Sequence, residues 1–170
     1  MKLRRYEEFD AKYVVAWVQD EIVYYQWCAG LLGEYPLTEE KINAYYNNLP
    51  KDVTFWAMTA EIEDEVVGHI TLRFADEERK TVRLGFVLIA HARRGQGIGK
   101  ELVSVAIRYA QQVLGAQQIT LGVFEENIFA RKCYESLGFI QNEERIEKYQ
   151  IKDEVWDFIE MIYMCPVGIE

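Results

Sequence analysis

The chain has 170 residues, of which half are apolar and 28% are charged, a composition that is typical of a folded globular protein and excludes a disordered one. Its 28 acidic and 19 basic residues give a net charge of −9, the wrong sign for a protein that neutralises nucleic-acid phosphates. The length predicts one domain over residues 1–170, and nothing resembles a secretory leader or a membrane span, so we expect a cytoplasmic protein without membrane contact. Three widely spaced cysteines without a CxxC pair predict neither a disulfide framework nor a metal site.

Apolar residues at three- and four-residue steps predict that the first third of the chain, residues 1–50, is helical and precedes all strands. One helical region runs from Phe9 to Leu32. A shorter helix is expected from Thr38, a suitable N-cap, to about Asn48.

The remaining chain, residues 54–164, reads as a sheet with two helices. Three strand-like runs separated by charged turns predict an antiparallel meander, and a helix from Ile98 to near Gly115 leads into a buried strand, which predicts a right-handed parallel crossover. A second helix, at about 127–137, precedes a final hairpin. The fold class is therefore α+β, with a mixed, mostly antiparallel sheet and helices on both faces. The predicted strands are 54–61, 66–74, 81–89, 119–124, 146–151 and 155–164.

The segment between the third strand and its following helix carries glycine at alternate positions, Gly95, Gly97 and Gly99. Glycines let the backbone approach a ligand, and the first amides of a helix, at the positive end of its dipole, suit phosphate oxygens. The spacing excludes a dinucleotide fingerprint, because Lys100 occupies the position of its last glycine. It also excludes a P-loop, because Glu101 follows that lysine.

Two motifs resemble those of the GCN5-related N-acetyltransferases. Residues 94–99 match the family's [Arg/Gln]-x-x-Gly-x-[Gly/Ala] signature, and residues 127–139 are similar to its N-x-x-A-x-x-x-Y-x-x-x-G-F pattern. The resemblance covers about Thr54 to Met164. It implies an enzyme, a monomer or homodimer, that uses acetyl-CoA as cosubstrate and moves the acetyl group to a primary amine directly, without a covalent enzyme intermediate.

The same resemblance implies roles for individual residues. The loop amides would hold the pyrophosphate of coenzyme A, and the end of the strand before the loop would pair with the pantetheine arm. Tyr134 would act as general acid toward the departing thiolate, and a backbone N–H near Leu88 would stabilise the carbonyl oxygen. Asn127 would cap its helix, bind pantetheine, or do both. The implied cofactor-binding residues are Val87, Leu88, Ile89, Arg94, Gly95, Gln96, Gly97, Ile98, Gly99, Lys100, Asn127 and Ala130.

The general base stays open in the sequence. Many members of the family place a glutamate two residues ahead of the glycine that corresponds to Gly85, but Arg83 stands there. Glu61, His69 and Glu125 are candidates by strand location, although each is better explained as a surface or packing residue. For His69, the shared strand face with Thr71 and Arg73 predicts a polar, partly wet surface.

The acceptor amine also stays open, as a polyamine, an aminoglycoside, a protein N-terminus, a lysine or a small metabolite. The resemblance implies that the N-terminal helical segment, residues 1–50, and the turn between the last two strands line the acceptor site. Acidic residues in these segments predict a cationic acceptor. The alternative function is a non-catalytic acyl-CoA-binding sensor or partner module, which the arginine at position 83 supports. A plain phosphate- or nucleic-acid-binding domain is disfavoured by the loop spacing and the charge. The acidic residues are Asp20, Glu21, Glu34, Asp153 and Glu154.

Overall fold

The computed structural model describes residues 1–50 and 54–166. Within these residues the chain forms a seven-stranded sheet in the order β1-β2-β3-β4-β5-β7-β6. Every neighbouring pair is antiparallel except β4 and β5, which are parallel. The α+β class and the mixed, mostly antiparallel sheet are therefore as predicted. The strands are β1 Lys2–Arg5, β2 Phe55–Ile62, β3 Glu65–Phe74, β4 Thr81–Ile89, β5 Gln118–Phe124, β6 Ile140–Ile151 and β7 Glu154–Met164.

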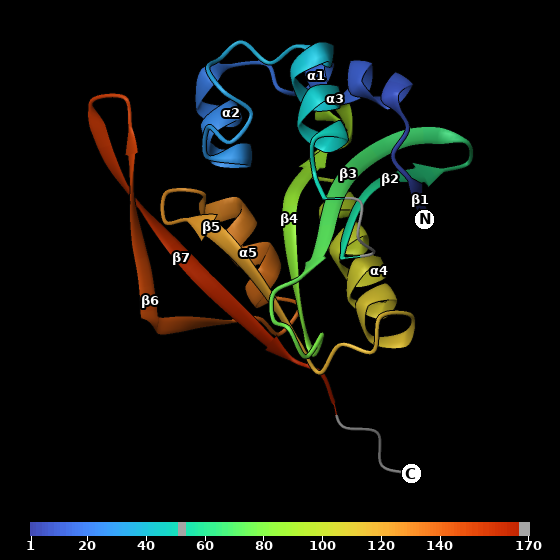
Figure 1. Cartoon of the computed structure of the whole chain (residues 1–170), viewed down its shortest axis with the longest axis vertical. Helices are drawn as coiled ribbons and strands as arrows, with labels where there is room; N and C mark the ends of the chain where they lie inside the picture. Colours follow the sequence, from blue (N-terminus) through green and yellow to red (C-terminus); the bar gives the residue numbers. More distant parts are fainter. Residues whose placement is uncertain (51–53, 167–170) are drawn as a thin grey trace.

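The helices cover the sheet in two groups (Figure 1). The group formed by α1, α2 and α3 lies at one end, over β3 and β4, whereas α4 and α5 lie beside the strands farther along. None of the helices in the described ranges is both long and apolar enough to span a bilayer. The helical elements are η1 Glu8–Asp10, α1 Ala11–Trp17, α2 Glu21–Cys28, α3 Glu39–Asn47, η2 His91–Arg93, α4 Ile98–Gln112 and α5 Ile128–Glu135.

The N-terminal third differs from its prediction in two ways. First, a strand precedes the helices, because the short and charged β1 pairs with the edge of β2 from Lys2 opposite Glu61 to Arg5 opposite Met58. Second, the helical region from Phe9 to Leu32 is broken into separate helices. The break occurs where the Asp20 side chain accepts a hydrogen bond from the backbone N–H of Val23, 2.8 Å away, and so starts α2 anew.

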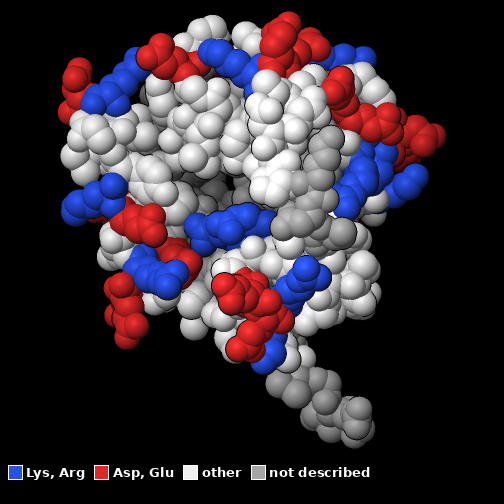
Figure 2. Space-filling view, viewed as in Figure 1, with Lys and Arg blue, Asp and Glu red and all other residues white. Residues whose placement is uncertain are grey.

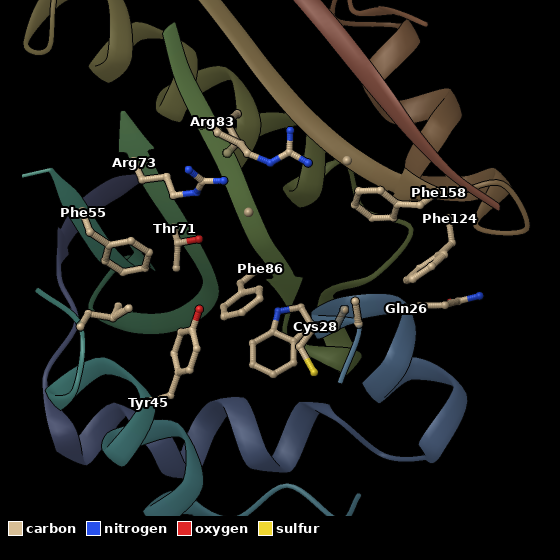
Figure 3. Close-up of a pocket in the computed structure, with 16 residues that line it drawn as sticks. Gln26, Cys28, Tyr45, Phe55, Thr71, Arg73, Arg83, Phe86, Phe124 and Phe158 are labelled. Carbon is tan, nitrogen blue, oxygen red and sulfur yellow. The ribbon is translucent and has the colours of Figure 1, made fainter. Parts of the chain in front are cut away.

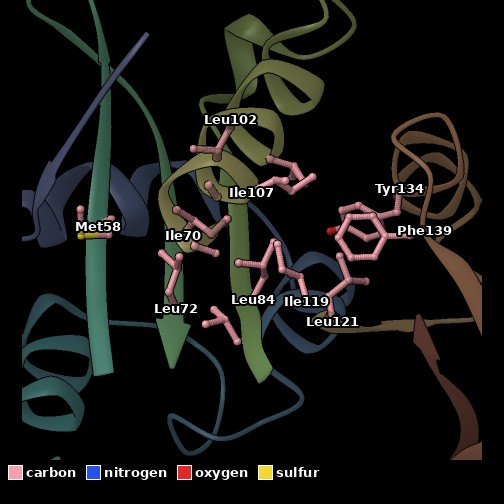
Figure 4. Packing of buried hydrophobic residues seen from close by; sticks show 14 of the residues in the cluster. Met58, Ile70, Leu72, Leu84, Leu102, Ile107, Ile119, Leu121, Tyr134 and Phe139 are labelled. Atoms are coloured by element: carbon pink, nitrogen blue, oxygen red, sulfur yellow. The ribbon is translucent and has the colours of Figure 1, made fainter. Parts of the chain in front are cut away.

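The central helix α4 follows the predicted amphipathic pattern. It buries five apolar residues against β3 and β4, and burial of each larger aliphatic side chain stabilises the fold by about 1.5–3 kcal/mol. Figure 4 shows this core, in which Leu102 and Ile107 of α4 meet Ile70 of β3 and Leu84 of β4. The buried α4 residues are Leu102, Val103, Ala106, Ile107 and Ala110.

A β-bulge in β4 changes which face its side chains occupy. Opposite β3, His69 pairs with Leu88 but Thr71 pairs with Gly85, so β4 contains one extra residue. Phe86, at this point, has φ +48°. Before the bulge, Leu84 packs in the α4 core, whereas after it Leu88 packs in the separate core formed by α1, α2 and α3. The bulge therefore connects the two cores through one strand.

The parallel pair β4–β5 separates beyond the bulge. The pairing runs from Thr81 opposite Gln118 to Leu84 opposite Leu121 and stops there. The following half of β4 keeps its pairing with β3, while the second half of β5 stays paired with β7. The sheet is thus split along its middle, and Figure 1 shows the two strands diverging, with β4 running toward the α1–α3 group and β5 running beside α5.

Candidate active site

The glycine loop forms the N-terminal boundary of α4. Gly97 is the N-cap residue of α4 and has φ +81°, a left-handed conformation that glycine adopts without strain. The first intrahelical bond is the one that the N–H of Glu101 donates to the carbonyl of Gly97, at 3.0 Å. The N–H groups of Ile98, Gly99 and Lys100 precede that bond in the chain and therefore have no carbonyl partner within the helix. A Cβ added at Gly95 or at Gly97 would meet no described atom within 4 Å, so the loop has room for a phosphate group beside its amides.

The basic residues near this loop fall into two groups. Arg93 forms an ion pair with Glu65, and Arg94 donates from Nη2 to the carbonyl of Trp17, 3.3 Å away. These two arginines therefore fasten the loop to β3 and α1. Lys100 makes no hydrogen bond or ion pair with the described residues. Gln96 donates from Nε2 to the carbonyl of Ala92, at 3.0 Å, which closes the loop on itself.

The edge of β4 beyond the bulge, Val87 to Ile89, is paired on its β3 side alone among the described strands. It ends directly at the loop, where the N–H of Ala90 donates to the carbonyl of Val67, at 2.9 Å. The other side of this segment faces the split in the sheet. Such an unpaired edge can accept an extended ligand as an additional strand.

Helix α5 places the predicted catalytic tyrosine on the opposite side of the split. Asn127 caps the helix by accepting from the N–H of Ala130, 3.3 Å away. Tyr134 is 7% exposed and packs on Phe139, and Figure 4 shows its hydroxyl pointing away from α5 toward the strands. Burial raises the pKa of Tyr134 above its ordinary value. Its phenol is therefore protonated throughout the physiological pH range.

The start of α4 lies near α5. Burial raises the pKa of the Cys133 thiol on α5, and the charge of Lys100 on α4 opposes that increase. The helix carrying Tyr134 thus lies beside the helix that begins at the glycine loop. The structure therefore brings three predicted features to one split: the loop, the β4 edge and the tyrosine.

A pocket of about 380 Å³ opens at the point where β4 and β5 separate. Its volume lies in the usual range for small-molecule sites. Figure 2 shows a hollow on this face with basic side chains along its border, and Figure 3 shows the lining side chains that it labels converging from several strands and helices. The described lining consists of Gln26, Trp27, Cys28, Ala29, Tyr45, Leu49, Phe55, Thr71, Arg73, Arg83, Leu84, Gly85, Phe86, Gly122, Phe124 and Phe158.

Within the described residues, the only charged side chains that line this pocket are those of Arg73 and Arg83. Arg83 donates from Nη1 to Oε1 of Glu160, 3.1 Å away. Burial, and secondarily the charge of Arg83, lowers the pKa of Arg73. The pocket is therefore electropositive on its β3–β4 wall.

The acidic residues on which the prediction of a cationic acceptor was based are not among the described residues that line the pocket. Asp20 caps α2, and Glu21 forms an ion pair with Lys152 that joins α2 to the β6–β7 turn. Glu34, Asp153 and Glu154 are also absent from the described lining. The Asp20 side chain serves as a helix cap, and those of Glu21 and Glu154 contact Lys152 and Trp156 instead.

The candidate bases are likewise outside the pocket. Glu61 is paired with Arg4 at 2.5 Å, and Glu125 lies 4.0 Å from Arg131. The predicted wet surface around His69 is wrong, because His69 is only 1% exposed and its Nε2 lies 2.7 Å from the hydroxyl of Tyr46. The α1–α3 layer covers this face of β3, which the sequence pattern of β3 alone could not indicate. Burial lowers the pKa of His69 to about 3.

Sequence reasoning missed several residues that shape the pocket. Trp27 and Phe158 come from segments more than 100 positions apart, and no local pattern connects them. Gly122 could have been found, because a lone glycine inside a strand often marks a close approach. A Cβ at this position would lie 2.0 Å from Cζ of Phe158 and 2.7 Å from Nη2 of Arg83. Glycine here lets the ring and the guanidinium cross β5.

Comparisons with solved structures agree with this architecture. The chain is similar to the spermidine N-acetyltransferase from Vibrio cholerae solved in complex with CoA and spermine, with a TM-score of 0.79, 20% identity and coverage of 96% of this chain and 94% of that one. A chimera of the Vibrio cholerae enzyme SpeG with hSSAT aligns with a TM-score of 0.78 and 20% identity over 96% of each chain. At these identities the likeness establishes the fold.

Sequence relatives cover shorter regions. Human N-acetylaspartate synthetase is 36% identical over 98 residues, which is 58% of this chain and 31% of that protein. The L-amino acid N-acetyltransferase AaaT of Escherichia coli (strain K12) is 27% identical over 111 residues, 65% of this chain and 67% of that one. The spermine/spermidine N(1)-acetyltransferase of Bacillus subtilis (strain 168) is 31% identical over 83 residues, 46% of this chain and 55% of that one. This chain spans about a third of the length of the N-acetylaspartate synthetases it matches.

The sequence model of the acetyltransferase (GNAT) family matches residues 6–139. This range contains the α1–α3 group, the split between β4 and β5, the glycine loop and Tyr134. The chain belongs to the acetyltransferase (GNAT) family.

Proposed function

We propose that this chain is an N-acetyltransferase that moves the acetyl group of acetyl-CoA directly to a small primary amine. The observation that carries the proposal is the split sheet. The glycine loop and the β4 edge form one side of the split, Tyr134 lies on the other, and the pocket opens at its apex. Two substrates can therefore reach the same point from different directions. Relatives named for the acetylation of amino acids and of polyamines are consistent with a small amine acceptor.

The residues present fit a coenzyme A molecule. The amides at the start of α4 and the open loop around Gly97 suit its pyrophosphate. Lys100, unpaired among the described residues, adds a positive charge there. The unpaired edge of Val87 to Ile89 offers backbone groups to the amides of the pantetheine arm. Acetyl-CoA supplies an activated acetyl group when bound.

Tyr134 is the proposed general acid. Departure of coenzyme A requires a proton on a thiolate sulfur, and a phenol that stays protonated at neutral pH can provide it. A backbone N–H near Leu88, on the free edge of β4, is the proposed donor to the carbonyl oxygen, because a preorganised amide stabilises charge that develops there. Neither role requires a covalent bond to the protein.

The acceptor amine must lose a proton, and the described lining of the pocket offers no carboxylate or imidazole to take it. We propose that the proton leaves through water. The rate should then rise with pH as more of the amine becomes neutral, because an alkylamine with a pKa of about 10.4 is almost wholly protonated at neutral pH.

The experiment that tests this function has two stages. A calorimetric titration with acetyl-CoA measures binding without any knowledge of the acceptor, and release of free coenzyme A thiol is then followed with a panel of primary amines. We expect saturable binding and amine-dependent thiol release. Binding without release for any amine would instead favour the second candidate, a non-catalytic acyl-CoA-binding module, which Arg83 at the position of the usual base supports. Absence of binding would contradict both.

A further inference from the structure

We propose that the acceptor is an amine that also carries a carboxylate, an amino acid in chemical class, and that Arg73 binds this carboxylate. The inference rests on the proposed acetyl transfer, because it assigns the pocket at the apex of the split to the acceptor. It replaces the cationic acceptor that the acidic composition suggested. Arg73 is then the residue that determines acceptor specificity.

The two arginines of the pocket stand directly opposite each other on neighbouring strands. Arg73 of β3 and Arg83 of β4 are register partners, and like charges in that arrangement destabilise a sheet. Figure 3 shows both guanidinium groups on the same side of the strands, facing the pocket. A fold that retains such a pair gains stability when an anion binds between or beside them.

Only one member of this pair has its charge balanced by the described residues. Glu160 accepts from Arg83 and also from Nδ2 of Asn142 at 3.0 Å, and Arg145 lies 3.7 Å from it. That carboxylate is therefore shared among Arg83, Asn142 and Arg145. Within residues 1–50 and 54–166, Arg73 forms no hydrogen bond or ion pair. Its guanidinium is available to form the paired hydrogen bonds that a carboxylate accepts.

A second observation also indicates an acceptor atom in this pocket. The Nε1 of Trp27 is buried, yet the described residues provide no hydrogen-bond partner for it. Trp27 is 9% exposed and lines the same pocket. Buried indole N–H groups normally find a partner. A ligand oxygen would satisfy this donor, whereas an ammonium group could not.

The other residues that line the pocket indicate the polarity of the acceptor's side chain. Four phenylalanines, Phe55, Phe86, Phe124 and Phe158, line the described pocket, and its neutral polar side chains include those of Thr71, Tyr45 and Gln26. Such a lining favours an apolar side chain and disfavours an extended polyamine, whose charges it would leave unpaired. The geometry therefore fits an amino acid with an apolar side chain, its amine directed to the split between β4 and β5.

The test compares acceptors that differ only in the carboxylate. Leucine and phenylalanine are each compared with their α-amides in the thiol-release assay, with phenethylamine and spermidine as further acceptors. We expect kcat/KM for each acid to exceed that for its amide by about 100-fold, since a charge-assisted pair is lost in the amide. The amides are a stringent comparison, because their amines deprotonate more easily and would react faster if the carboxylate had no role.

Substitutions of Arg73 test whether this residue causes the preference for the acid over the amide. Arg73→Leu should raise KM for the acids by about 100-fold, leave KM for acetyl-CoA unchanged and abolish the preference for acid over amide. Arg73→Lys should restore part of that preference, because it keeps the charge but not the paired geometry. Arg108→Leu, at an exposed arginine on α4, is the matched control and should behave as the wild type. The wild-type comparison stands even if Arg73→Leu fails to fold.

A binding measurement separates this inference from the proposed function. N-acetylphenylalanine and its amide are titrated into the protein in the presence of coenzyme A, which requires no turnover. Weaker binding of the amide, and of the acid to Arg73→Leu, would support the carboxylate site even if no amine were acetylated. Equal affinity for both would overturn it. Equal kcat/KM for acid and amide, or a preference for spermidine, would overturn it while leaving the acetyltransferase proposal intact.

Discussion

The two halves of the candidate site are built in different ways. The cofactor half consists of consecutive residues, the end of β4, the glycine loop and the start of α4, and it presents mainly backbone amides. The acceptor half collects side chains from β2, β3, β4, β5, β7, α2 and α3, which are separated by more than 130 positions between Gln26 and Phe158. The first half depends on local backbone conformation, and the second depends on how distant elements pack. Substitutions in the cofactor half should therefore weaken acetyl-CoA binding, whereas substitutions in the acceptor half should disturb the packing of distant elements.

The largest effect confined to the cofactor half is expected from Gly97→Glu. The change places a carboxylate at the N-terminus of α4, where the phosphate should bind, in a backbone conformation with φ +81°. We expect the affinity for acetyl-CoA to fall by at least about 10²-fold, because juxtaposed like charges cost several kcal/mol. Calorimetric titration with acetyl-CoA measures this loss of affinity.

The matched control is Gly115→Glu, because Gly115 also has a positive φ of +71° and open space around it but follows the other end of α4. It should lose stability and keep its affinity for acetyl-CoA. If both variants bind acetyl-CoA normally, the cofactor half has been assigned to the wrong loop.

Tyr134→Phe tests the connection between the halves at the point of chemistry. The phenyl ring keeps its packing on Phe139, so the Kd for acetyl-CoA should not change, while kcat should fall by about 10²-fold or more. Because burial raises the pKa of this tyrosine, the acid stays protonated at high pH. The wild-type kcat should therefore not decline below about pH 10 through this group. An equal loss of kcat and of affinity would contradict the general-acid role.

Gly122→Ala tests the acceptor half through its packing. The added Cβ would lie 2.0 Å from Phe158 and 2.7 Å from the Arg83 guanidinium, and overpacking of this kind destabilises a fold by about 1–3 kcal/mol. Denaturant unfolding measures the loss, which Phe158→Leu should reduce in the double variant by making room. Gly99→Ala is the control for stability, because its Cβ would make only an ordinary contact at 3.7 Å. A Gly122→Ala protein as stable as the wild type would show that β5 and β7 adjust freely.

The smallest effect concerns the layer behind the acceptor pocket. Burial lowers the pKa of His69 to about 3, against an ordinary value near 6.5. Between these values the unfolded chain binds a proton at His69 that the folded chain does not, so stability should decrease as the pH falls below about 6.5. From pH 7 to pH 5 this group should cost about 2 kcal/mol.

The unfolding free energy of the wild type and of His69→Gln, measured at both pH values, checks this expectation. The variant should lack that part of the pH dependence. Parallel pH curves for the two proteins would mean that His69 is protonated in the folded state or reaches water.

Much of the cofactor half could be predicted because its signals are local. The predicted strand 81–89 coincides with β4, the helix begins at Ile98 as expected, and Asn127 caps α5. Glycine spacing and hydrophobic periodicity act within a few residues, so both can be recognised in the sequence alone. The family resemblance added roles that periodicity could not supply, and those roles for Tyr134 and the loop remain predictions to be tested.

The acceptor half could not be predicted, and His69 and the acidic residues show why. Alternation along β3 places His69, Thr71 and Arg73 on one face, but in the structure His69 and Thr71 are buried, and only Thr71 and Arg73 line the pocket. The acidic residues lie in the expected segments, yet none of them is among the described lining of the pocket. Burial and pairing of this kind depend on which elements meet.

By itself, the sequence determined the order of the strand meander, the parallel crossover, the position of the glycine loop and the net charge of −9. Only the tertiary structure decided that the charge inside the pocket is opposite in sign to the charge of the whole chain. The physical reason is that net charge is a sum over all residues, whereas a pocket presents only those few side chains that packing brings together. Here that packing selected Arg73 and Arg83 from a chain with a net charge of −9.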